Sequence, residues 1–146
     1  MIDNQKNAEL GQLLIDLARC LLQYVGECWP WTGDHDLAQR TIEELVSRQK
    51  EKIGCVAALL NQRRQLVDFG AYPTEFTDLH YLALDHLLQR LIENEESLIG
   101  VLQQAVGDCA EDVEAARLLD QISAGERKNL EQLHGLQARH AIKNEA

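Results

Sequence analysis

Apolar residues recur about every 3.6 positions along most of the chain, which is the spacing of an amphipathic helix. The pattern predicts four helices, near residues 6–28, 35–65, 76–105 and 109–138. No segment shows the strict alternation of apolar and polar residues that is typical of a half-buried strand. The 146 residues therefore predict one all-α domain, a four-helix bundle that spans residues 1–146.

The breaks in this pattern carry residues that end or begin helices. Pro30 disfavours a helical residue before it, so the first helix is expected to end near residue 28. Thr74 or Thr77 can cap the third helix after the second proline of the chain. Asp108, with Glu111 three residues later, resembles a capping box for the last helix.

The segment between the second and third helices, residues 67–77, is too long for a tight turn. Fully extended it can span roughly 36 Å, and a helix of about 30 residues is roughly 45 Å long. It could therefore run most of the length of the bundle as a crossover that makes these two helices parallel. Val67, Phe69, Tyr72 and Phe76 would seal it onto the helices. The alternative is a loop between antiparallel helices, but long structureless loops are uncommon in compact domains, so we favour the crossover.

Polar residues interrupt the apolar stripes of two helices. In the last helix, a helical wheel places Glu126 and Asn129 on the buried stripe. In the second helix it places Gln49 and Lys52 at the equivalent gap. Each pair is three residues apart, so both side chains of a pair face the same neighbour. A polar layer is therefore expected in the middle of the bundle.

The last helix also contains a motif with the spacing of metal ligands, but its position on the helix argues against that role. Residues 131–134 read Glu-x-x-His, a spacing that di-iron bundles use for metal ligands. The wheel turns Glu131 away from the apolar stripe and leaves His134 at its edge. We therefore expect this pair to face outward.

The layout resembles the ferritin-like superfamily, which includes ferritins and rubrerythrins, over nearly the whole chain. In that family the second and fourth helices each carry an inward Glu-x-x-His, and the first and third each supply an inward Glu. SAGERKNLEQL resembles the fourth-helix segment with Asn129 in place of the His. RQKEKIGCVAALL resembles the second-helix segment with Gln49 for the Glu and Lys52 for the His. The closest likeness is to bacterial members with a degenerate di-metal site.

The heights of these residues along the bundle extend the comparison. Gln49 lies roughly 11 residues from the end of the bundle, and at that level we expect Leu17 on the first helix and residues 84–88 on the third. Leucines would thus replace the two remaining carboxylates. We expect Lys52 to pair with Glu126 in a metal-free site, with Gln49 and Asn129 filling the other hydrogen bonds, because a buried charge persists only when paired and bonded.

Two other polar residues of the third helix are candidate site residues. His80 and Glu95 are about four turns apart, too far to share an ion. Glu95 lies within the charged run 93–96 and is expected to be solvated where the bundle opens.

The cysteines show no Cys-x-x-Cys spacing, so free thiols are expected; they are Cys20, Cys28, Cys55 and Cys109.

Composition restricts the partners. The formal net charge of −10 argues against nucleic acid and anionic membranes, which attract Lys- and Arg-rich surfaces. No apolar run approaches the ~20 residues of a membrane span, and the first residues do not resemble a signal peptide, so a cytoplasmic protein is expected.

Trp29 and Trp31 form the densest aromatic feature, either a partner-binding tip or a plug at the bundle end.

The sequence thus predicts a non-catalytic bundle that acts through protein association. A homodimer is expected, with contacts at outer positions such as Leu22, Leu79, Tyr81 and Leu82. No catalytic residue and no cofactor is expected. The alternatives are a di-metal oxidase or ferroxidase with an atypical ligand set, which would bind iron or manganese, and a small-ligand binder that uses the polar layer.

Overall fold

The computed structural model describes residues 4–28, 36–79 and 83–145. In these ranges the chain is helical and contains no strand, as the periodicity predicts. None of the helices in these ranges is both long enough and apolar enough to cross a membrane. The elements are α1 (Asn4–Ala18), α2 (Leu21–Glu27), α3 (Asp36–Gln62), the 3-10 helix η1 (Thr74–Leu79), α4 (Leu84–Asp108) and α5 (Val113–Glu145).

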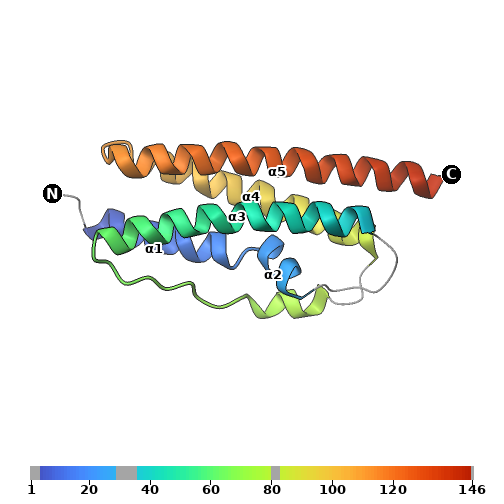
Figure 1. Cartoon of the computed structure of the whole chain (residues 1–146), viewed down its shortest axis with the longest axis horizontal. Helices are drawn as coiled ribbons and strands as arrows, with labels where there is room; N and C mark the ends of the chain where they lie inside the picture. The colour runs from blue at the N-terminus through green and yellow to red at the C-terminus, as the bar shows by residue number, and fades with distance from the viewer. Residues whose placement is uncertain (1–3, 29–35, 80–82, 146) are drawn as a thin grey trace.

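The long helices α1, α3, α4 and α5 lie side by side along the long axis of the molecule (Figure 1). Helices α3 and α4 run in the same direction, and α1 and α5 run in the opposite one. The extended segment after α3 returns along the bundle before η1 and α4 begin. This course agrees with the crossover that the sequence favours over a loop between antiparallel helices.

Aromatic and polar contacts hold the crossover against α1 and α2. The ring centroids of Tyr72 and Tyr24 are 5.3 Å apart in an edge-on arrangement. The Arg19 guanidinium lies 4.8 Å from the Tyr72 centroid, and its Nε donates a hydrogen bond to the Gly70 carbonyl at 2.9 Å. Phe76 is buried, as expected, but Phe69 is 40% exposed and does not seal the segment.

Gly70 allows this close approach. Its φ is +70°, a left-handed conformation that favours glycine. A Cβ at this position would lie 2.7 Å from a methyl carbon of Ile15. The crossover therefore passes over α1 at a point where a side chain would prevent it.

Three of the predicted helices have different limits in the structure, and the last of them, expected near 109–138, is α5 (Val113–Glu145). The first is broken at residues 19–20, which separate α1 from α2. The third begins at Leu84 rather than near residue 76, because Thr74–Leu79 forms the 3-10 helix instead. Thr77, expected as an N-cap of the third helix, lies inside this 3-10 helix, and its Oγ1 donates to the Thr74 carbonyl at 2.7 Å.

The turn between α4 and α5 also differs from the prediction. Helix α4 continues through Asp108, so Asp108 does not cap α5. The cap is Asp112, whose Oδ1 accepts a hydrogen bond from the Ala115 amide at 3.3 Å. Both Asp112 carboxylate oxygens also accept hydrogen bonds of 2.8 Å from Arg63, just after the end of α3. This buried ion pair joins α3 to α5 and holds the pKa of Asp112 below its usual value.

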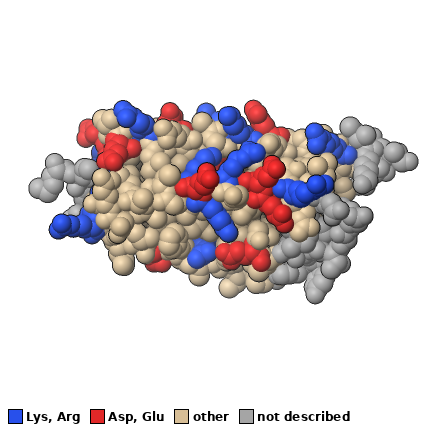
Figure 2. All heavy atoms as spheres, viewed as in Figure 1, with Lys and Arg blue, Asp and Glu red and all other residues tan. Residues whose placement is uncertain are grey.

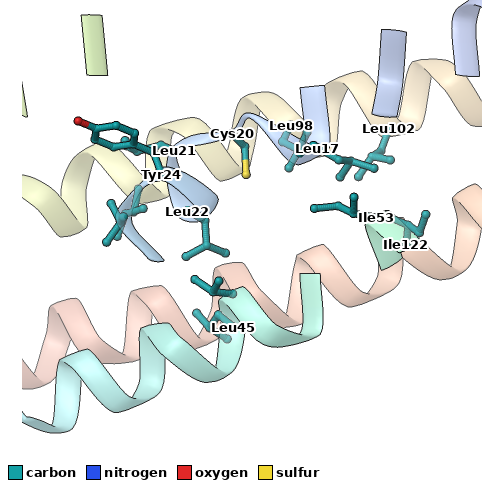
Figure 3. Packing of buried hydrophobic residues seen from close by; sticks show 14 of the residues in the cluster. Leu17, Cys20, Leu21, Leu22, Tyr24, Leu45, Ile53, Leu98, Leu102 and Ile122 are labelled. Carbon is teal, nitrogen blue, oxygen red and sulfur yellow. The ribbon is translucent and has the colours of Figure 1, made fainter. Parts of the chain in front are cut away.

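The core is made mainly of leucines from every long helix. Figure 3 shows Cys20 and Leu22 pointing from the first helices toward the interior, with Leu45 of α3 on the facing side. Leu22 is 1% exposed, so it belongs to the core and not to the dimer contact expected from the sequence. The side chain of Leu79 and the residues Tyr81 and Leu82 lie outside the described parts, so that contact stays a prediction there.

Candidate functional site: a closed polar layer in the core

The break between α1 and α2 turns polar groups toward the centre of the molecule. Cys20 has an extended backbone at the break, and the Leu21 amide that follows donates a hydrogen bond to Asn94 Oδ1 of α4 at 3.0 Å. Cys20 and Gln23 are both buried. Gln23 is not among the candidate residues of the sequence, since an unbroken helix would not bring it inward.

Gln49 of α3 is the centre of the layer. Its Oε1 accepts hydrogen bonds from Gln23 Nε2 at 2.9 Å and from the Cys20 thiol at 3.1 Å. Its Nε2 donates to Glu126 Oε2 at 3.1 Å and to Glu95 Oε1 at 3.4 Å. Both the oxygen and the nitrogen of the Gln49 amide are therefore hydrogen-bonded, and these partners determine the orientation of the amide.

Two carboxyl groups meet on the other side of Gln49. Glu126 of α5 also accepts a hydrogen bond from Asn129 Nδ2 at 3.1 Å, one turn further along the same helix. Glu95 of α4 is 1% exposed, which overturns the expectation of a solvated residue. Glu95 is therefore the residue of α4 that lies beside Gln49, whereas residues 84–88 were expected there.

The two carboxyl groups share a proton. Burial, followed by the charge of Glu126 and a side-chain hydrogen bond to it, raises the pKa of Glu95 to about 10. Glu95 is therefore protonated at neutral pH and donates to Glu126. Glu95 Oε2 and Glu126 Oε1 are buried, and neither has a hydrogen-bond partner among the described atoms, so these two oxygens are the ones left to hold the proton.

The thiol of Cys20 belongs to the same closed network. Burial is the main cause that raises the pKa of Cys20 to about 12. The thiol is therefore a neutral donor to Gln49 and not a nucleophile. Cys109 is also buried, and Cys28 and Cys55 are exposed; all four are free thiols, as the sequence predicts.

Lys52 lies beside the layer but does not enter it. No ion pair of 4.0 Å or less joins Lys52 to Glu126, and both residues are in the described part of the chain. The expected direct pair is therefore not formed, because Gln49 and Asn129 already donate to Glu126 and Glu95 supplies the neutralising proton. Lys52 acts only at a distance, as one of the smaller causes that lower the pKa of Glu95.

The absence of a side chain at Gly125 accounts for the position of the Lys52 ammonium. A Cβ on Gly125 would overlap the Lys52 ammonium, so the missing side chain makes the space that the lysine occupies. The lysine is half-buried there, against α5. Gly54, a helical glycine near this layer on α3, has open space around it, and nothing in the structure explains its presence.

Other candidate residues lie away from the layer. Glu131 and His134 are exposed, in agreement with the helical wheel. Trp29, Trp31 and His80 lie outside the described residues. The four positions expected to form the degenerate site are thus split: Gln49, Glu126 and Asn129 are in direct contact, and Lys52 is adjacent.

The side chains of the layer do not fit a pair of metal ions. A di-iron bundle uses four carboxylates and two histidines, whereas this layer has two carboxyl groups, three amides and a thiol. Within the described ranges, no three or more His, Cys, Asp or Glu side chains are arranged to hold a metal.

Comparisons of this chain with protein-family models, with curated protein sequences and with solved structures found no match in any of the three.

Proposed function

We propose that the protein is a non-catalytic bundle of the ferritin-like type whose metal site has become a proton-sharing hydrogen-bond layer, and that it acts by binding another protein. The observation that carries this proposal is the closed network around Gln49. Both ends of its amide are bonded, and the raised pKa of Glu95 leaves a proton for the two carboxyl oxygens that have no other partner among the described atoms.

The arrangement of the helices supports the ferritin-like part of the proposal. Helices α3 and α4 are parallel, and α3 and α5 each present a polar pair spaced by three residues. Helix α4 adds one inward carboxyl group, Glu95, and the first helical pair adds Cys20 and Gln23. The family pattern has an inward residue on each of these two helices, so inward polar residues on both of them support this part of the proposal.

Metal analysis tests the loss of the metal site. Protein purified from culture supplemented with iron and manganese is expected to carry far less than one metal ion per chain. The matched variants are Glu126→Ala and Glu96→Ala, because Glu96 is an exposed neighbour of Glu95 on α4. Near-stoichiometric metal that disappears in Glu126→Ala and persists in Glu96→Ala would instead establish the di-metal alternative.

A groove between α1 and α4 is the surface that best supports association. Its cavity volume is about 520 Å³, and Leu13, Val101 and Ala105 form its apolar floor. Val101, one of these lining residues, is 43% exposed. The charged residues that line it are all acidic: Glu9, Asp16 and Asp108. A second copy placed in this groove would bring like charges together, so the groove favours a partner helix with Lys or Arg beside its apolar face.

A designed peptide tests this surface directly. An amphipathic helix with leucines on one face and lysines beside them should bind the protein, and the same helix with glutamates for lysines should not. Val101→Glu is expected to weaken the lysine peptide about tenfold or more, because it buries a charge in the contact. Equal binding of the two peptides, or a homodimer by light scattering that Val101→Glu abolishes, would contradict the assignment of this groove to a basic partner.

A further inference from the structure

A cleft between α3 and α5 lies on the outer side of the polar layer. Its cavity volume is about 400 Å³. Three of its side chains are cationic and one is acidic, in a chain whose net charge is −10. Figure 2 shows Lys and Arg side chains gathered near the middle of this face, with Asp and Glu beside them. The cleft is lined by Arg48, Glu51, Lys52, Gly125, Lys128 and Asn129.

Lys52 is held in the cleft without a counterion. Its ammonium occupies the space that a side chain at Gly125 would fill. In the described part of the chain it makes no ion pair of 4.0 Å or less, with Glu51 or with any other acid. A half-buried cation loses part of its solvation, and no described acid lies close enough to Lys52 to form an ion pair in exchange. An anion in the cleft would supply the missing partner.

Arg48 is positioned across the same two helices. Its Nη1 donates a hydrogen bond of 2.8 Å to Gln132 Oε1 of α5, and its Nη2 lies 3.7 Å from Glu44 on its own helix. These contacts leave further guanidinium N–H groups for a ligand. Lys128 of α5 is exposed at the cleft. The cleft therefore combines one planar guanidinium group with two ammonium groups, those of Lys52 and Lys128.

We propose that this cleft is a binding site for the phosphate group of a small molecule, with Arg48, Lys52 and Lys128 as its ligands. Guanidinium groups bind phosphate oxygens in pairs, and lysine adds point charges around them. The cavity is larger than a phosphate group alone, so it also admits a small substituent. The site is distinct from the closed polar layer and does not depend on the protein's association with a partner.

Calorimetric titration of the full chain with inorganic phosphate, at constant ionic strength set with chloride, tests the site. Saturable binding to one site is expected. Lys52→Gln and Arg48→Gln should each weaken it about tenfold or more, because each removes a charge-assisted hydrogen bond. Lys50→Gln removes the same charge from an exposed position of α3 outside the cleft, and should change the affinity less than about twofold.

Gly125→Ala gives an independent check, since its Cβ would push the Lys52 ammonium out of place while leaving every charge in the protein. It should weaken phosphate binding with the helical circular dichroism unchanged. Methyl phosphate that binds at least as tightly as inorganic phosphate would identify a phosphomonoester as the ligand, and weaker binding would identify free phosphate. Absence of saturable phosphate binding, or equal weakening by Lys50→Gln and Lys52→Gln, would overturn the proposal.

Discussion

The shared proton between Glu95 and Glu126 makes the stability of the protein depend on pH in a defined direction. The pKa of Glu95 is about 10 in the folded protein, compared with 4.5 for an ordinary glutamate side chain such as that of the unfolded chain. Folding therefore takes up one proton between these values. Stability from this group is fully present below about pH 4.5 and declines as the pH rises toward about 10, by about 1.4 kcal/mol per pH unit.

Glu95→Gln should remove this dependence. The glutamine has nearly the same shape as the protonated acid, and its amide can donate to Glu126 at all pH values. From about pH 6 to about pH 8, the free energy of unfolding of the variant should therefore gain roughly 3 kcal/mol relative to that of the native chain. Urea unfolding followed by circular dichroism, repeated across this range, measures the difference.

Every other titratable group is present in both proteins, so the difference between the two profiles reports Glu95 alone. Glu96→Gln, at the exposed neighbouring position, serves as the control and should follow the native profile. Parallel profiles of Glu95→Gln and the native chain would refute the reasoning, since they would mean that Glu95 is ionised in the folded protein.

Three further predictions concern the stability of the fold. Asp112→Asn keeps a good cap for α5 but removes the charge that faces Arg63, so it should lower the free energy of unfolding at neutral pH by about 3 kcal/mol in urea titrations. Because the folded pKa of Asp112 is lowered, this contribution is present above its unfolded value of 3.8 and is lost as the pH falls through the folded pKa, so the two proteins should converge in acid. Gly54→Ala should raise the free energy of unfolding by up to about 1 kcal/mol, measured as a higher melting temperature, because its Cβ would meet open space in a helix. Gly26→Ala should lower the melting temperature, because its Cβ would lie 2.7 Å from a methyl carbon of Val46.

Glu95 shows how far the sequence could lead. Leu91, Glu95 and Leu98 follow one another at steps of four and three residues, so the helical period itself favours a buried Glu95. The surrounding charges at 93 and 96 argued for solvent, but they lie on the exposed side of the same helix. Its level was missed because the third helix was expected to start near residue 76 instead of 84, which is an error of about 12 Å along the helix. Counted from Leu84, 11 residues lead to Glu95.

The break after α1 could not be predicted in the same way. No proline or glycine lies at residues 19–20, and the apolar period continues through them. The break is stabilised from outside: Arg19 binds the Gly70 carbonyl, and Asn94 of α4 accepts the Leu21 amide. Such tertiary contacts override local helix propensity, and a single sequence does not reveal them. The pairs in α3 and α5 were predicted because their burial follows from the period alone.

The clamp between Arg19 and the crossover bears on the order in which the chain folds. The Arg19–Gly70 hydrogen bond joins residues 51 positions apart, whereas α4 and α5 are adjacent along the chain and joined by a short turn. Closing a long loop costs more chain entropy than closing a short one, so contacts at large separation tend to form late. We expect the α4–α5 hairpin to form first and the crossover to close over α1 last. The polar layer contains residues of the early α4–α5 hairpin and residues that follow α1. We therefore expect Glu95 to bind its proton only when folding is nearly complete.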